Sequence, residues 1–296
     1  MLLNHTLGTT RDLIHLLRPK QWVKNIFVLA PLLFSGEFVD LYSVVDAVWA
    51  VIFFCLAASA VYIINDYYDI ESDQRHPIKS RTRPLASGTV SRLQAVGLLA
   101  FIVVGLVIGY FIVSKVMVII AIYILLNCVY TLVLKNIAVI DIFCISVGFV
   151  LRVYAGAVAL SVPVSPWMFV TTLCLALFLG SVKRRQELRH HGKEGRQVLD
   201  SYSLTLVDKY AMISSMGALF FYSLFVITEK TEMVVSVPVV IYGLFRYWYL
   251  AEFMNDGESP ADTLLSDWQL ILTVLGWLAV CIVCLWPSGW NFQWWW

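Results

Sequence analysis

The chain has 296 residues, of which 60% are hydrophobic and 14% are charged, and its mean hydropathy is +0.78. A soluble domain is about 45–50% apolar and about 25% charged, so this chain lacks the polar residues to cover its surface in water. The composition excludes an ordinary soluble domain and predicts an integral membrane protein. The net charge of +1 indicates no partner by itself, and we expect no nucleic-acid partner.

The first predicted element is an amphipathic helix at 1–22. Over its second half, leucines and basic residues recur at helical spacing, which gives the helix one apolar and one basic face. Such a helix is expected to lie on the cytoplasmic leaflet.

Nine segments of mostly apolar residues follow, each close to the length that crosses the hydrocarbon core as a helix. They predict an all-α, polytopic membrane bundle of about nine transmembrane helices in a single domain over 1–296. The predicted spans are 23–39, 43–64, 91–113, 116–134, 138–160, 164–182, 210–228, 234–254 and 268–287.

Two longer connections, 65–90 and 183–209, are rich in charge, and long loops in compact proteins tend to be functional. Seventeen of the 21 lysines and arginines fall on the side of the membrane that holds these loops. Because cytoplasmic loops carry an excess of basic residues, this side should be cytoplasmic. We therefore expect a multi-pass protein of the inner (plasma) membrane, with the N-terminus inside and the C-terminus outside.

An acidic motif closes the second predicted span. Asp66, Asp69 and Asp73 are spaced i, i+3, i+7, which places them on one helical face, and Asn65 adds a neutral oxygen. Three carboxylates on one face repel each other unless a cation binds them. Mg²⁺ prefers oxygen ligands and is often held by one or two carboxylates together with substrate phosphates. The motif therefore predicts a magnesium site.

Basic residues follow the acidic motif directly: Arg75, Lys79 and Arg83 lie in the same loop. A solvated, charge-balanced helix end is the simpler interpretation of such a run. Carboxylates for a metal followed by bases for phosphate oxygens, however, are what a bound diphosphate requires. We favour the second interpretation.

This NDxxDxxxD motif, followed by Arg83-Pro84-Leu85-Ala86-Ser87-Gly88, resembles the first motif of the UbiA superfamily of intramembrane prenyltransferases. The resemblance implies a helical bundle around a central cavity open to the cytoplasm and the bilayer, and Mg²⁺ that activates a diphosphate leaving group. Aromatic prenyltransferases of the superfamily carry a second acidic motif, DxxxD, after the sixth span. Here that loop begins with Lys183 and Arg184 and contains no DxxxD, so a basic anion site replaces the second acidic one.

Segments 17–25, 130–135 and 183–188 together are similar to the polyprenyl-phosphate phosphoribosyltransferase branch of that superfamily. The similarity implies transfer of 5-phosphoribose from phosphoribosyl diphosphate (PRPP) to a polyprenyl phosphate. It also places the Tyr130–Lys135 turn in the active site.

Charges at membrane depth are costly and usually face a cavity or a partner. Asp141 is therefore a further candidate, whereas Arg152 and Arg246 stay unassigned. The predicted catalytic residues are Asp66, Asp69, Asp73 and Lys135, and the three aspartates are also the predicted metal ligands. The predicted substrate-binding residues are Lys24, Asn65, Arg75, Lys79, Arg83, Tyr130, Asp141, Lys183 and Arg184.

Two alternatives stay open. An aromatic prenyltransferase would use a prenyl diphosphate and a 4-hydroxybenzoate-like acceptor, and the absent DxxxD argues against it. An ion-coupled transporter would use the intramembrane charges as an ion path, but the sequence has no detectable internal repeat. The expected partners are PRPP, polyprenyl phosphate and membrane lipids, and a homo-oligomer is an open alternative to a monomer.

Overall fold

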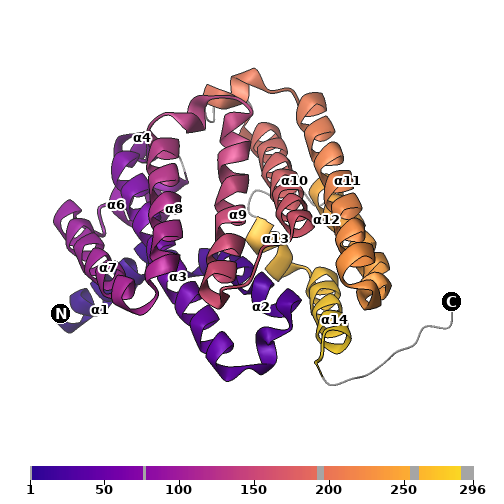
Figure 1. Cartoon of the computed structure of the whole chain (residues 1–296). Helices are drawn as coiled ribbons and strands as arrows, with labels where there is room; N and C mark the ends of the chain where they lie inside the picture. The colour runs from indigo at the N-terminus through magenta and orange to yellow at the C-terminus, as the bar shows by residue number, and fades with distance from the viewer. Residues whose placement is uncertain (1, 76–77, 192–196, 254–259, 288–296) are drawn as a thin grey trace.

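The computed structural model describes residues 2–75, 78–191, 197–253 and 260–287, and every regular element in these ranges is helical (Figure 1). The longer elements are α1 (Leu2–Leu17), η1 (Pro19–Leu29), α2 (Ala30–Ser35), α3 (Leu41–Tyr68), α4 (Ile70–Arg75), α5 (Lys79–Thr82), α6 (Pro84–Ser87), α7 (Arg92–Ile112), α8 (Ser114–Leu132), α9 (Ile140–Leu160), α10 (Pro166–His191), α11 (Leu204–Glu229), α12 (Val237–Phe253), α13 (Pro260–Ser266) and α14 (Trp268–Cys284). Short 3₁₀ turns join several of them: η2 (Glu37–Val39), η3 (Leu134–Asn136), η5 (Gln197–Ser201) and η6 (Thr231–Ser236).

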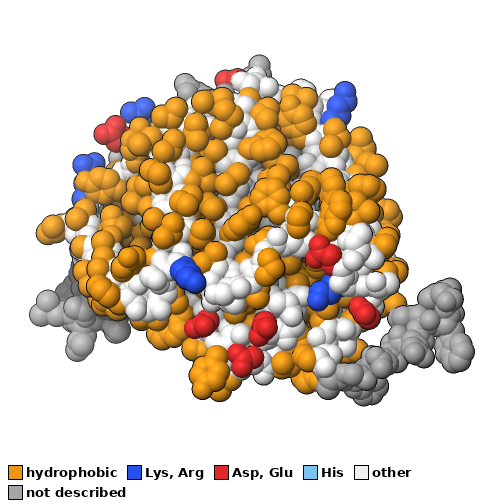
Figure 2. Space-filling view, in the orientation of Figure 1, with side chains coloured by type: hydrophobic (Ala, Val, Ile, Leu, Met, Phe, Trp, Pro, Cys, Tyr) orange, Lys and Arg blue, Asp and Glu red, His pale blue; other side chains and the backbone are white. Residues whose placement is uncertain are grey.

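Seven helical segments are long and apolar enough to cross a membrane: α3, α7, α8, α9, α10, α11 and the η6–α12 segment. Hydrophobic side chains cover the middle of the face shown in Figure 2, and charged side chains gather toward its upper and lower ends. This pattern is the one that a bilayer requires of a protein surface. The prediction of an all-helical, multi-pass membrane protein is therefore confirmed.

The first predicted span, 23–39, is not a single α-helix. Residues 19–29 form the 3₁₀ helix η1, which continues into the short helix α2. The segment runs antiparallel to α3, since the Trp22 indole donates to Ser59 Oγ (3.0 Å) and the Asn25 amide donates to Cys55 Sγ (3.1 Å). A 3₁₀ helix rises about 2.0 Å per residue against about 1.5 Å in an α-helix, so η1 and α2 together still reach about 30 Å.

Close backbone packing accompanies this unusual geometry. A Cβ on Gly156 of α9 would lie only 1.9 Å from the carbonyl oxygen of Val28, so η1 contacts the α9 backbone directly. The expected N-terminal helix is also shorter than 1–22. It ends at Leu17, because Arg18 adopts a left-handed conformation (φ 53°) and Pro19 follows. Leu16 is fully buried, so α1 packs against the bundle as well.

The last predicted span, 268–287, is the 17-residue helix α14, capped by the Asp267 carboxylate, which accepts from the Leu270 N–H (2.8 Å). Arg246 of α12 pairs with the same carboxylate (2.6 Å), and Trp277 of α14 packs edge-on against Phe34 of α2. Within the described ranges, seven of the nine predicted spans are helices long and apolar enough to cross a membrane, and the η1–α2 segment and α14 lie at the other two.

Two helices form the centre of the bundle. In α3 and α9, 56% of the most apolar stretch is buried inside the protein, compared with 22–33% in the other five long helices. These two helices carry Asp66 and Asp141 at neighbouring ends, so the central helices also position the candidate site.

Candidate functional site

Two of the three motif carboxylates meet on one guanidinium. Asp66 lies in the last turn of α3 and Asp73 in α4, with Asp69 as the non-helical residue between them (φ −89°, ψ 6°). Arg83 Nη1 donates to Asp66 Oδ1 (2.9 Å) and to Asp73 Oδ2. The carboxylate side chains are only 2% and 4% exposed, so this is a buried pair of acids bridged by one base.

Further cations surround the same pair. Arg18 Nη2 donates to Asp66 Oδ1 (2.6 Å) and stacks over the Tyr62 ring (5.0 Å), and Lys79 Nζ lies 3.8 Å from Asp73 Oδ1. Sequence reasoning did not select Arg18. Arg18 belongs to segment 17–25, which carries the family resemblance, but the amphipathic pattern placed it on the basic face of the predicted interfacial helix.

Asp69 points toward a different base. Its Oδ1 accepts from Lys135 Nζ (2.8 Å), and the same ammonium lies over the Tyr68 ring (5.4 Å). Lys135 comes from η3, the turn between α8 and α9. The two side chains are 18% and 22% exposed, so this pair borders the opening of the site whereas Asp66 and Asp73 lie inside it.

The three motif carboxylates were predicted to bind one metal ion together. Among the described residues, no three His, Cys, Asp or Glu side chains gather closely enough to hold one ion. Asp66 Oδ2, however, is buried and has no hydrogen-bond partner, which is costly for a carboxylate oxygen. Mg²⁺ needs only one or two protein carboxylates when phosphates complete its shell, so Asp66 and Asp73 fit it.

Four other predicted residues, Asn65, Arg75, Lys183 and Lys24, have other surroundings or contacts in the structure. Asn65 Oδ1 accepts from Thr131 Oγ1 (3.3 Å) and so links α3 to the end of α8. Arg75 is exposed, Lys183 lies 4.0 Å from Glu187, and Lys24 is half-buried within η1.

Arg184, a predicted phosphate ligand, is fully buried. Its Nε donates to Asp141 Oδ2 (2.5 Å), its Nη1 to Glu187, and its Nη2 to the Tyr130 hydroxyl (3.3 Å). Asp141 is equally buried and accepts from the Tyr202 hydroxyl through Oδ1 (2.6 Å). The structure therefore brings Tyr130, Asp141 and Arg184 together in a network of their own, beside the Lys135 turn.

Other basic residues of the 183–209 connection hold helices together. Arg185 pairs with Asp208 (2.5 Å) and Glu252, and Arg189 pairs with Glu252 (3.1 Å). These contacts join α10 to α11 and α12. The 183–209 connection lacks a second acidic motif, and in its described part Arg185 and Arg189 form ion pairs within the protein.

Arg152, left unassigned by the sequence, is buried in α9. Its Nε donates to Asn25 Oδ1 (2.8 Å) and its Nη2 to the Tyr123 hydroxyl (3.1 Å). Its guanidinium also lies over the rings of Tyr123, Phe54 and Phe149 at 4.9–5.4 Å. These contacts tie η1, α3 and α8 to α9.

The fold and this site define a polytopic, all-α membrane protein whose acidic and basic side chains meet at one end of the bundle. Residues 26–266 match the model of the UbiA prenyltransferase family, and the chain belongs to that family. The resemblance stated from the NDxxDxxxD motif is therefore confirmed.

Similar proteins extend over nearly the whole chain. It is 37% identical to the decaprenyl-phosphate phosphoribosyltransferase of Mycolicibacterium smegmatis, over 90% of both chains. It is 33% identical to the protein of that name from Corynebacterium glutamicum, over 92% of this chain and 85% of the relative. A UbiA homologue from Archaeoglobus fulgidus, solved with GPP and Mg²⁺, has the same fold, with a TM-score of 0.71 at 19% identity over 93% of this chain and 99% of that one.

Proposed function

We propose that this protein transfers 5-phosphoribose from PRPP to a polyprenyl phosphate of the decaprenyl type. The relatives that carry this activity in their names match about nine tenths of the chain. The observation that carries the proposal is the buried Asp66–Arg83–Asp73 cluster with Arg18 and Lys79 around it. It combines carboxylates for a cation with bases for the oxygens of a diphosphate.

In this proposal the carboxylates of Asp66 and Asp73 hold Mg²⁺, and the unpaired Asp66 Oδ2 supplies one ligand oxygen. When bound, Mg²⁺ neutralises negative charge on the diphosphate and so makes it a better leaving group. Arg83 and Arg18 then exchange a carboxylate contact for phosphate oxygens, which the planar guanidinium binds in a bidentate manner. The UbiA homologue from Archaeoglobus fulgidus, which shares this fold, was solved with Mg²⁺, and this supports magnesium as the cation of the proposal.

The reaction forms one bond and breaks one at C1 of the ribose. A phosphate oxygen of the lipid attacks C1, and the bond between C1 and the diphosphate oxygen breaks, so that its electron pair leaves with the diphosphate. The lipid phosphate has a second pKa of about 6 and is already largely dianionic at neutral pH, so the step needs no strong base. Lys135, beside Asp69, stabilises the charge that grows on the leaving group. Direct attack predicts inversion at C1.

The site end of the bundle faces the cytoplasm in this proposal, because most lysines and arginines lie at that end. PRPP then enters from the cytoplasm, and the polyprenyl chain stays in the bilayer. With nine crossings the C-terminus lies outside.

A paired assay tests the function. Purified protein in detergent receives Mg²⁺ and either PRPP with a polyprenyl phosphate, or a polyprenyl diphosphate with 4-hydroxybenzoate, each with and without EDTA. We expect lipid-linked phosphoribose and diphosphate in the first arm alone, and loss of both with EDTA. Product in the second arm alone would instead establish the aromatic prenyltransferase.

A further inference from the structure

The turn that carries Lys135 has a strained backbone. It links α8 to α9, and its last residue before α9, Val139, has φ 70° and ψ −49°. A β-branched residue rarely adopts a positive φ, since its Cβ crowds the backbone. Such a conformation persists only where the surroundings hold it.

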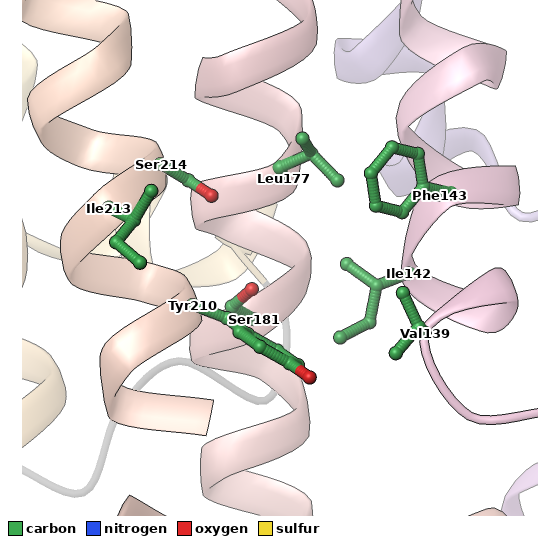
Figure 3. A pocket seen from close by; sticks show the side chains of 8 residues that line it. All are labelled: Val139, Ile142, Phe143, Leu177, Ser181, Tyr210, Ile213 and Ser214. Carbon is green, nitrogen blue, oxygen red and sulfur yellow. The ribbon is translucent and has the colours of Figure 1, made fainter. Parts of the chain in front are cut away.

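Packing does not enclose Val139 on all sides. A cavity of about 250 Å³ opens next to it between α9, α10 and α11, and Figure 3 shows Val139 and Ile142 facing Ser181 and Tyr210 across this space. The volume lies below the ~300–1,000 Å³ of usual ligand pockets, and we do not place the lipid chain there. Side-chain packing from this direction therefore leaves the turn weakly held.

Hydrogen bonds to the Tyr202 hydroxyl hold the α8–α9 turn in place instead. The Tyr202 hydroxyl accepts from the Val139 N–H (2.6 Å) and donates to Asp141 Oδ1 (2.6 Å). Burial and the hydrogen bond to Asp141 raise the pKa of Tyr202 above its usual value, so its hydroxyl keeps the proton that it donates. Tyr202 follows η5, so this contact joins the α10–α11 connection to the α8–α9 turn.

The same network reaches the other end of the turn. Arg184 donates to Asp141 Oδ2 (2.5 Å) and, through Nη2, to the hydroxyl of Tyr130 in α8 (3.3 Å). Tyr130 precedes Lys135 by five residues and Val139 follows it by four. One buried set of hydrogen bonds therefore fixes both sides of the turn.

We propose that Tyr202 is a positioning residue, which with Asp141 and Arg184 holds the 133–139 turn so that Lys135 reaches Asp69 and the leaving diphosphate. The reaction named here rests on the proposed function, whereas the placement of Lys135 does not. Tyr202 itself touches no substrate in this account. Its effect on transfer passes through Lys135 alone.

The first test is a double-mutant cycle. Tyr202→Phe keeps the ring but removes both buried hydrogen bonds of the hydroxyl, and the loss of the two together should lower kcat about tenfold. The KM for polyprenyl phosphate should not change. In a Lys135→Ala background the same substitution should have no further effect, because the group that it positions is gone. Additive losses in the two backgrounds, or an unchanged kcat, would overturn the proposal.

A second measurement does not depend on activity. Competitive acylation with acetic anhydride, read by mass spectrometry, reports how accessible Lys135 is, and Tyr202→Phe should increase its labelling. Tyr222→Phe is the matched control, since that hydroxyl is also buried but bonds Ser236 and Trp277, away from the turn. Equal labelling of Lys135 in the Tyr202→Phe and Tyr222→Phe variants would contradict the proposal, even if no phosphoribosyl transfer is found.

If Tyr202→Phe alone does not fold, the labelling is measured in Tyr202→Phe combined with Val139→Gly. Glycine adopts a positive φ without cost, so this pair removes the strain together with the hydrogen bond that restrains it. Glycine also does not enforce this φ, so without the Tyr202 hydroxyl the turn is free to leave its conformation. Increased labelling of Lys135 in the pair supports the proposal, and wild-type labelling overturns it.

Discussion

The side chains of the site are held by pairs that join distant parts of the sequence. Arg83 bridges Asp66 and Asp73, and Arg18 reaches Asp66 from a segment 48 residues earlier. The sequence predicts the acidic motif and the bases beside it, because their spacing is local. It does not predict which acid meets which base, since that depends on how helices approach each other. Arg184 illustrates this limit: it was expected to bind phosphate and is buried against Asp141.

A first prediction concerns Arg18. Its guanidinium lies on Asp66 and is expected to bind diphosphate oxygens, so Arg18→Ala should raise the KM for PRPP about 10-fold or more, as for a lost charge-assisted hydrogen bond. Steady-state kinetics with each substrate varied in turn measure this. Lys115→Ala, an exposed lysine at the far end of the bundle, is the control. An unchanged PRPP dependence in Arg18→Ala would remove Arg18 from the site.

A second prediction concerns Asp141. Asp141→Ala removes the fully buried carboxylate that pairs with Nε of Arg184 and leaves the guanidinium only its contacts with Glu187 and Tyr130. Breaking a buried ion pair costs up to about 3–5 kcal/mol. Thermal unfolding in detergent should show a clearly lower Tm. Asp200→Ala, at an exposed carboxylate in η5, should leave the Tm unchanged. Equal Tm values for both variants would mean that Arg184 does not depend on Asp141.

At the scale of elements, hydropathy predicts where the chain crosses the membrane, but it does not predict the type of helix. The η1–α2 segment has the apolar composition of a span, and it forms a 3₁₀ helix where its backbone lies against Gly156. That contact is tertiary and leaves no local signal around residues 19–29. Likewise, the i, i+3, i+7 spacing predicted that the three aspartates share one helical face. In the structure the helix breaks at Asp69, so Asp66 lies in α3 and Asp73 in α4.

The close approach at Gly156 leads to a third prediction. Gly156→Ala places a methyl group against the Val28 carbonyl, so η1 must move, at a cost of about 1–3 kcal/mol as for overpacking. Gly97→Ala in α7, where a Cβ meets nothing within 4 Å, is the matched control and should stabilise the helix slightly. Thermal unfolding of both variants compares them. A Gly156→Ala protein as stable as Gly97→Ala would show that η1 and α9 do not pack as described.

At the scale of the whole molecule, the prediction of a helical membrane bundle rests mostly on composition. Apolar content and the distribution of lysine and arginine depend little on tertiary detail, so the sequence predicts the membrane bundle and its crossings well. The NDxxDxxxD motif pointed to the family, which the match over residues 26–266 confirms. The networks around Arg152, Arg185 and Tyr202 depend on the assembled bundle and were not predicted.

The orientation of the bundle gives a fourth prediction. In a cysteine-free background, Lys115→Cys should react with a membrane-impermeant maleimide in intact cells, whereas Asp200→Cys should react only after permeabilisation. The reason is that Lys115 lies in the first turn of α8, at the end opposite the basic site. The reverse labelling pattern would place the site outside the cell.

The most direct measurement of the central claim is transfer of labelled phosphoribose from PRPP to polyprenyl phosphate in proteoliposomes containing Mg²⁺. Wild-type protein is compared with Asp66→Asn and Asp73→Asn, and with Lys115→Gln as a control for reconstitution. We predict labelled lipid with wild type and the control, and at least a ~10²-fold loss in both carboxamide variants, since each lacks a charge that stabilises the leaving group. Undiminished transfer in either carboxamide variant, or no labelled lipid with wild type, would contradict the account.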